Sequence, residues 1–237
     1  MSAPEYVQRF SSRQRLEHLG VMLLFVVLAV TGFPQKFPDA AWSPALANAL
    51  GGIESMRFLH RASGFLFAAL AAVHIGTAAY LAARRRIPWS MVPTRKDFRD
   101  SAAMVRYFMG SSDQRPRFGR FDYREKFEYW GLVFGGVIMS ATGVVLLFPI
   151  AFANLAGGAL IPVAKVTHSQ EGLMAFLVVI TWHIYNAHFA PEIFPFNRTI
   201  FTGKISRERL RHEHPLEYEQ LFPKGDGDPP SGERHDA

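Results

Sequence analysis

The sequence contains no cysteine. Covalently attached c-type haem, thiolate-bound iron–sulfur clusters and disulfides all need cysteine, so this chain can form none of them. The remaining side chains that bind metals are histidine, methionine and oxygen donors, and the chain has nine histidines and eight methionines. Any metal that the chain holds must therefore be bound by these ligands.

Charged residues are scarce in four long stretches, about Leu16–Phe33, Phe58–Ala83, Phe127–Ile150 and Val163–Phe189. Each stretch has about the length that a helix needs to cross a bilayer core ~30 Å thick. The first stretch lacks a small-residue cleavage site and is followed by TGFPQKFP, so we interpret it as a retained helix and not a signal peptide. The pattern predicts an all-α integral membrane protein built as a four-helix bundle.

Basic residues are distributed unevenly between the connecting segments. Of the 26 Lys and Arg, 22 lie in residues 1–17, 82–126 and 189–237, and the opposite side receives only Lys36, Arg57, Arg61 and Lys165. By the positive-inside rule, both termini are predicted to be cytoplasmic. The net charge of +6 then reflects topology and contact with anionic membrane lipid, and we expect no nucleic-acid partner.

The connecting segments predict the domain organisation. We expect a transmembrane domain over residues 1–190 with a frayed lead at 1–15, and a cytoplasmic polar tail over 191–237 whose last part, 224–237, is disordered. AWSPALANALGG and KDFRDSAAMVRYFMG are predicted to be amphipathic interfacial segments. AFANLAGGALIP is expected to form a short loop before the fourth helix.

Four histidines lie in pairs on the second and fourth apolar stretches. His60 and His74 are fourteen residues apart, and His168 and His183 fifteen. These spacings are close to four helical turns, so both members of a pair face nearly the same way, roughly 21–23 Å apart along the helix. Two such helices can hold two stacked haems, each between two imidazoles. His60 with His168 forms the outer pair, and His183 takes either His18 or His74 in the inner pair.

Glycines and basic residues recur at fixed offsets from these histidines. A glycine four residues after each outer histidine leaves room for a flat macrocycle against the backbone: Gly64 and Gly172. A basic residue three positions before a candidate ligand lies nearer the water, where haem propionates point: Arg15, Arg57 and Lys165.

A zinc site and a haem-free function are the alternatives to a haem protein. Zinc ligands must all lie about 2 Å from one ion, and histidines fourteen or fifteen residues apart on a helix do not converge in that way. A haem-free scaffold or transporter with structural histidines is the alternative function. Transporters typically have helices that are interrupted by Gly or Pro at mid-membrane, and the second and fourth stretches have no interior proline.

The chain resembles the membrane cytochrome b subunits of formate dehydrogenases and nickel–iron hydrogenases over roughly residues 9–220. The matching stretches are RQRLEHLGVMLLFVVLAVTGFP, RFLHRASG, RFDYREKFEYWGLVFGGVIMSATGVVLLFP and HSQEGLMAFLVVITWHIYNAH. This resemblance implies a four-helix cytochrome b domain with two b haems. It implies His60 and His168 as ligands of the outer haem, and His18 and His183 as ligands of the inner one.

The chain departs from that family in carrying two extra histidines, His74 and His188, and in a spacing on the fourth helix that is one residue longer. A haem set of the quinol–cytochrome c reductase type, with His74 opposite His183, therefore remains the second possibility for the inner pair. The spare histidines also leave room for a third haem.

The resemblance implies a quinone site near the inner haem, at the start of the third apolar stretch. The matching segment RFDYREKFEYW offers Asp122, Arg124, Glu125 and Lys126 for the headgroup and its protons. His188 is a further quinone candidate. The family's amide and glycine at this site are replaced here by Asp122 and Arg124.

The expected function is electron transfer in the bacterial inner membrane, between a periplasmic redox partner and menaquinone or ubiquinone. The sequence has no recognisable site for a primary substrate. Such a site must then belong to a partner, either a multihaem cytochrome c or an iron–sulfur protein. The chain is expected to be one subunit of a larger oxidoreductase complex.

Overall fold

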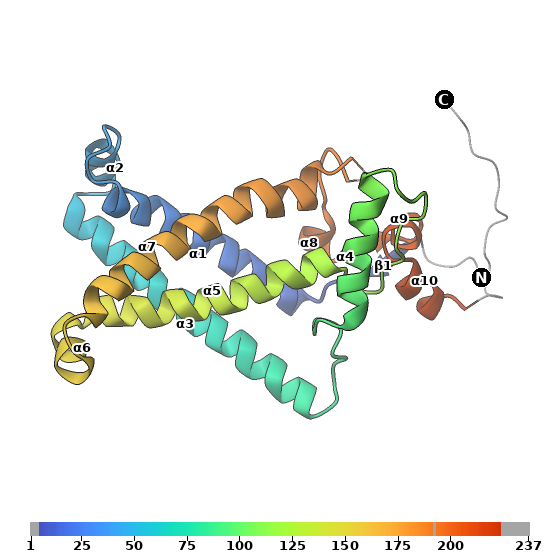
Figure 1. Cartoon of the computed structure of the whole chain (residues 1–237), viewed down its shortest axis with the longest axis horizontal. Helices are drawn as coiled ribbons and strands as arrows, with labels where there is room; N and C mark the ends of the chain where they lie inside the picture. Colours follow the sequence, from blue (N-terminus) through green and yellow to red (C-terminus); the bar gives the residue numbers. More distant parts are fainter. Residues whose placement is uncertain (1–4, 192, 224–237) are drawn as a thin grey trace. The chain divides into compact units, whose positions relative to one another are not determined.

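A computed structural model describes residues 5–191 and 193–223, and these residues are mostly helical. Figure 1 shows the elements in chain order. They are β1 (Tyr6–Gln8), α1 (Ser12–Lys36), α2 (Ser43–Ala49), α3 (Ile53–Ala83), α4 (Arg95–Phe108), α5 (Tyr123–Leu147), α6 (Pro149–Ala156), α7 (Leu160–Val178), the π-helical turns η1 (Val179–His183) and η2 (Tyr185–Phe189), α8 (Thr199–Thr202), β2 (Lys204–Ser206), α9 (Arg207–Glu213) and α10 (Pro215–Leu221). Disorder was predicted for residues 224–237, which lie outside the described residues.

Within the described residues, four helices are long and apolar enough to cross a membrane, as predicted: α1, α3, α5, and the continuous run Leu160–Phe189 formed by α7, η1 and η2. Few of their apolar side chains are buried within the structure: no more than 6% of the residues in the most apolar part of each helix are buried, and the rest are half-buried or exposed. Exposed apolar surface on helices of this length is the surface that lipid covers. The four predicted spans are therefore confirmed by length and composition.

The chain divides into two compact units. The helical unit comprises residues 12–88 and 128–197, in which α1 packs against α3, α2 and α7. The polar unit comprises the described parts of residues 1–11, 89–127 and 198–237. The domain boundary predicted at residue 190 remains a prediction. The polar unit differs from the predicted tail in that it also includes segments from the start and the middle of the chain.

The polar unit brings together segments that are far apart in the sequence. β1 pairs antiparallel with β2, with Val7 opposite Ile205. Val7 and Phe222 pack against a small core of Ile205, Leu210 and Tyr218. The expectation of a frayed lead was thus wrong for residues 6–15, because β1 finds a partner strand and α1 already begins at Ser12. The tail beyond 191 likewise folds into short elements as far as Leu221, because its few apolar residues share this core.

The connection before α7 also differs from the expected loop. Residues Pro149–Ala156 form α6, and Pro149 begins it. Proline suits the first turn of a helix, where its missing N–H has no intrahelical partner. Gly157 ends the helix with a φ of +87°, a conformation that glycine adopts without strain.

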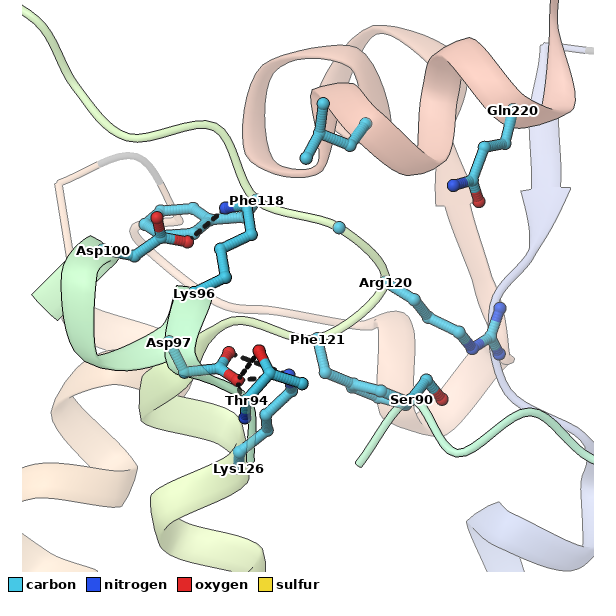
Figure 2. Close-up of a pocket in the computed structure, with 12 residues that line it drawn as sticks. Ser90, Thr94, Lys96, Asp97, Asp100, Phe118, Arg120, Phe121, Lys126 and Gln220 are labelled. Atoms are coloured by element: carbon cyan, nitrogen blue, oxygen red, sulfur yellow. Dashed lines mark hydrogen bonds and ion pairs between the residues drawn. The ribbon is translucent and has the colours of Figure 1, made fainter. Parts of the chain in front are cut away.

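Helix α4 contributes Lys96, Asp97 and Asp100 to the lining of a pocket in the polar unit (Figure 2). The Asp97 carboxylate accepts hydrogen bonds from the N–H (2.6 Å) and the hydroxyl (2.8 Å) of Thr94 at the start of the helix. It also accepts two from Lys126 Nζ, at 2.8 and 2.9 Å. Burial raises the pKa of Asp97, but the hydrogen bonds from Lys126 and Thr94 together lower it by more than burial raises it. The pKa of Asp97 therefore lies below its usual range. The charged Asp97–Lys126 pair therefore anchors α4 to the start of α5.

Candidate functional site

The outer histidines face each other across the helical unit. His60 on α3 and His168 on α7 have ring centroids 6.3 Å apart, with an angle of 76° between the ring planes. A metal–imidazole bond is about 2 Å and a ring nitrogen lies about 1.1 Å from its ring centroid, so two imidazoles on opposite sides of one ion have centroids roughly 6 Å apart. The separation of the two rings therefore fits a bis-histidine metal centre.

Each outer histidine has its Nδ1 atom held by a threonine. Thr31 Oγ1 lies 2.9 Å from His60 Nδ1, and Thr142 Oγ1 lies 2.9 Å from His168 Nδ1. Both hydroxyls donate their single proton to a carbonyl one turn earlier, those of Val27 and Ile138, at 2.7 Å. The hydroxyl oxygens must therefore accept from Nδ1–H, which leaves each Nε2 unprotonated and able to bind a metal.

A glycine after each threonine lets the imidazole ring approach the neighbouring helix. A Cβ atom at Gly32 would lie 3.2 Å from His60 Cε1, and one at Gly143 would lie 3.4 Å from His168 Cε1. Our sequence reasoning missed these Thr-Gly pairs. The available signal was the repetition of the dipeptide in AVTGF and SATGV, one on each helix that precedes a histidine helix.

The inner pair brings together His18 of α1 and His183 of η1. Their ring centroids are 6.2 Å apart with an angle of 39° between the planes, a separation that again fits two ligands of one ion. His183 Nδ1 lies 2.7 Å from Oε2 of Glu128 on α5. The carboxylate can only accept, so His183 donates from Nδ1 and its Nε2 is left for a metal.

His74 is occupied at both ring nitrogens. Its Nδ1 lies 2.8 Å from Glu17 Oε2, and its Nε2 lies 3.1 Å from the Tyr129 hydroxyl. Arg13 Nε in turn donates to Glu17 Oε1 at 2.6 Å. These contacts link α1, α3 and α5. The structure therefore places His18, rather than His74, opposite His183.

The π-helical turn η1 accounts for the longer spacing between His168 and His183 on the fourth helix. An α-helix turns by about 100° per residue, so fifteen residues would rotate His183 about 60° past four full turns from His168. A π-helix has more residues per turn and absorbs one extra residue. The turn η1 lies between the two histidines and ends at His183, so it absorbs the extra residue, and in the structure His168 faces His60 and His183 faces His18.

The residues predicted around the haems occupy different surroundings. A Cβ atom built on Gly64 would meet open space, with no described atom outside its own stretch of helix backbone within 4 Å, whereas one on Gly172 would lie 3.4 Å from Met139 Cε. Arg15 Nη2 donates to Ser12 Oγ at 3.2 Å, and Arg57 Nη1 pairs with Glu54 Oε1 at 3.2 Å. Lys165 is exposed.

Three of the four quinone candidates in RFDYREKFEYW contact each other at the start of α5. Asp122 Oδ1 accepts from the N–H groups of Arg124 and Glu125, at 2.8 and 2.9 Å, and Glu125 Oε2 accepts from the N–H of Asp122 at 2.9 Å. This reciprocal arrangement is a capping box, which satisfies the free N–H groups at a helix start. Arg124 Nη2 also pairs with Asp122 Oδ2 at 2.7 Å, and Lys126 pairs with Asp97 as described above.

His188, the fifth quinone candidate, lies on η2. Its ring stacks on Phe196, with centroids 4.3 Å apart and planes within 9°. Its Nδ1 accepts from the N–H of Asn197 at 3.3 Å, so that ring carries its proton on Nε2 when neutral.

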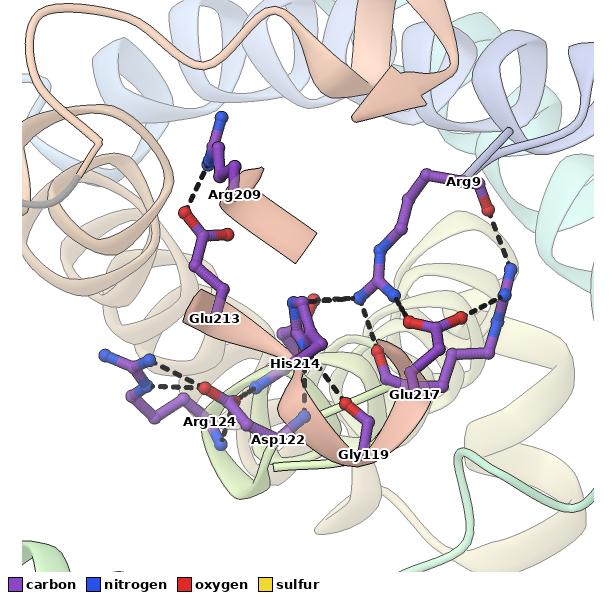
Figure 3. A network of polar contacts seen from close by, with 10 residues as sticks. Arg9, Gly119, Asp122, Arg124, Arg209, Glu213, His214 and Glu217 are labelled. Carbon is purple, nitrogen blue, oxygen red and sulfur yellow. Dashed lines mark hydrogen bonds and ion pairs between the residues drawn. The ribbon is translucent and has the colours of Figure 1, made fainter. Parts of the chain in front are cut away.

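A buried charge network lies in the polar unit (Figure 3). Arg9, Asp122, His214 and Glu217 are each no more than 7% exposed. The Arg9 guanidinium donates to Glu217, to the carbonyl of Arg120 and to His214 Nε2, while His214 Nδ1–H donates to the Gly119 carbonyl at 2.7 Å. Burial and the nearby Arg9 charge lower the pKa of His214 to about 4. His214 is therefore neutral at physiological pH.

The described residues contain no group of three or more His, Cys, Asp or Glu side chains arranged around a metal ion. The arrangement that the helical unit does offer is two pairs of imidazoles, one pair near each end of the helices. In His60, His168 and His183 a hydrogen bond fixes the tautomer that leaves Nε2 free. This chemistry fits planar iron macrocycles that are bound from both faces.

Comparison with known proteins adds a family and named relatives. A family model described as prokaryotic cytochrome b561 matches residues 9–195. The cytochrome b556(Fdn) subunit of the nitrate-inducible formate dehydrogenase of Escherichia coli (strain K12) is 22% identical over 222 residues, which cover 93% of this chain and 94% of that protein. The cytochrome b556 subunit of formate dehydrogenase from Haemophilus influenzae is 24% identical over 215 residues, which cover 90% of this chain and 82% of that protein.

Proposed function

Because the chain belongs to the prokaryotic cytochrome b561 family, we propose that it carries electrons through two bis-histidine b haems between a periplasmic redox partner and the quinone pool. The coarser part of this function rests on the family and the four spans: the chain is a multi-pass cytochrome b of the bacterial inner membrane with a role in electron transport. The two histidine pairs, with centroids 6.3 and 6.2 Å apart, are the observation that carries the finer part.

His60 and His168 would hold the outer haem, and His18 and His183 the inner one. Haem b supplies one-electron redox chemistry when it is bound. The chain's own residues orient the imidazoles: Thr31 and Thr142 hold the outer rings, and Glu128 holds His183. Both nitrogens of His74 are in use, which argues against His74 as a ligand and against a third haem built on it.

The relatives named above are subunits of formate dehydrogenases. We therefore infer that this chain is the membrane subunit of a similar oxidoreductase complex. Its partner would be a periplasmic iron–sulfur or multihaem cytochrome c subunit that carries the site for the primary substrate. The excess of basic residues in residues 1–17, 82–126 and 189–237 supports cytoplasmic termini, and with them a His60–His168 pair that lies toward the periplasm.

Quinone would exchange electrons and protons near the inner pair, as in the family that the chain resembles. Lys126, Asp122, Arg124 and Glu125 all have partners within the protein, so a headgroup would have to compete with those contacts. His188 differs, since its Nε2–H can donate to a quinone carbonyl while Nδ1 stays bonded to Asn197. Menaquinone and ubiquinone both have such carbonyls.

A reduced-minus-oxidised spectrum of the purified chain, with haem quantified as the pyridine haemochrome, tests this function. We expect a b-type α-band and two haems per chain. A folded protein that is made with an adequate haem supply and contains no haem would instead support the haem-free scaffold or transporter. The helix from Leu160 to Phe189 runs without a break, which does not favour that alternative.

Helix α4 is proposed to lie on the anionic inner leaflet. Phe98, Val105, Phe108 and Met109 are 73%, 56%, 74% and 74% exposed, and at about 100° per residue they share one side of the helix. Three arginines form one edge of that side: Arg95, Arg99 and Arg106. Apolar side chains flanked by basic ones are typical of interfacial helices, and each Lys or Arg near an anionic surface contributes about 1 kcal/mol.

The absence of cysteine allows a direct test of this placement. A Phe98→Cys variant that carries an environment-sensitive fluorophore should show blue-shifted emission and quenching by lipid-borne quenchers in anionic nanodiscs. The same label at Tyr107, nine residues on and half a turn round the helix, should stay in water and be quenched weakly. Equal quenching at the two positions would contradict an interfacial α4.

A further inference from the structure

The two histidine pairs differ in the charge of the groups that hold them. In the outer pair, both Nδ1–H groups donate to neutral hydroxyls, Thr31 and Thr142. In the inner pair, the Nδ1–H of His183 donates to a carboxylate, Glu128, at the shorter distance of 2.7 Å. The Glu128 side chain is 18% exposed, so water only partly weakens this contact.

We propose that Glu128 is a positioning residue that makes His183 the strongest electron donor among the ligands and so gives the inner haem a lower reduction potential than it would otherwise have. A carboxylate that accepts from Nδ1–H draws the proton away from the ring and increases the electron density on Nε2. A ligand that donates more electron density stabilises ferric over ferrous iron, and hydrogen bonding of this kind is one of the means by which proteins tune haem potentials. The proposal rests on the di-haem function described above.

The chain contains a matched contact that separates this effect from that of a nearby charge. Glu17 holds Nδ1 of His74 at 2.8 Å, as Glu128 holds that of His183. The Nε2 of His74, however, bonds to the Tyr129 hydroxyl and not to a metal. The two carboxylates therefore make the same contact with a histidine, and only that of Glu128 reaches a proposed ligand.

The test is a redox titration of the α-band in the purified full-length protein, together with EPR of the ferric haems. In Glu128→Gln the side-chain amide oxygen still accepts from Nδ1–H, and the negative charge is lost. We expect the midpoint potential of one of the two haems to rise by at least 59 mV, which for one electron is a tenfold change in the reduction equilibrium. The other transition should not move, and the EPR signal of only one haem should change. Glu17→Gln should leave both transitions near their wild-type positions.

Several results would overturn the proposal. One is a Glu128→Gln protein that binds both haems and keeps both midpoint potentials unchanged. Another is a rise in midpoint potential in Glu17→Gln that equals the rise in Glu128→Gln. If Glu128→Gln loses one haem, Glu128→Asp decides the outcome, since it keeps the charge. Recovery of the haem supports the proposal, and continued loss contradicts it. A wild-type protein without two haem transitions would refute the di-haem function itself, which keeps the two failures distinct.

Discussion

Replacing His18 by alanine is expected to halve the haem content, from two haems per chain to one. The structure places the His18 ring 6.2 Å from that of His183, so its loss removes one face of the inner site. Replacing His74 by asparagine should leave both haems in place, because His74 bonds to Glu17 and Tyr129. Pyridine haemochrome quantification against protein mass measures both variants.

The matched outer variant is His60→Ala. It should also lower the content to one haem per chain, and the remaining redox transition should be the one that Glu128→Gln shifts. If His74→Asn loses a haem while His18→Ala keeps two, the inner site would be of the quinol–cytochrome c reductase type, with His74 opposite His183. That result would also show that the Glu17 and Tyr129 contacts break when haem binds.

The four spans and the facing histidines could be predicted because both depend on simple periodicity. A membrane span needs only length and low charge, and residues fourteen or fifteen apart return to nearly the same side of a helix. The choice between His18 and His74 needed more than spacing. It depends on where α1 and α5 lie relative to α3, which decides whether Glu17 and Tyr129 reach His74.

Partners of the histidines were missed because they lie on the preceding helix of each pair. On α1, Glu17 holds His74 of α3 and Thr31 holds His60 of α3. On α5, Glu128 holds His183 of η1 and Thr142 holds His168 of α7, so the same residue types make the same two contacts. Thr31 follows Glu17 by fourteen residues, and Thr142 follows Glu128 by fourteen. This internal repeat was visible in the sequence, but a comparison of the histidine helices alone does not show it.

The polar unit was underestimated because its stability depends on pairing between distant segments. The isolated stretch around Arg9 has few apolar residues and suggests a frayed end. In the structure, Arg9 is 4% exposed and donates to Glu217, more than two hundred residues away. Local composition cannot predict a buried ion pair between two ends of a chain, since each charge alone would favour water.

Glu217→Gln should strongly destabilise the polar unit. Glu217 is 6% exposed and accepts from Arg9 and from Arg120 Nη1, the latter at 2.7 Å. The neutral amide has nearly the same shape but leaves the Arg9 guanidinium buried without its main counter-charge. Removing one partner of a buried pair costs about 3–5 kcal/mol. Opening of this unit, measured by hydrogen exchange in peptides that span β2 to α10, should therefore become between about a hundredfold and a few thousandfold more frequent.

Glu219→Gln is the matched control on the same helix. Glu219 pairs with Arg117, but the two side chains are 54% and 55% exposed, and exposed pairs contribute between zero and about 1 kcal/mol. Exchange in this variant should stay close to that of the wild-type protein. Similar exchange in both variants would mean that Arg9 reaches water or another acceptor when Glu217 is neutral. The association of β1 with the end of the chain would then depend on the Ile205, Leu210 and Tyr218 core rather than on charge.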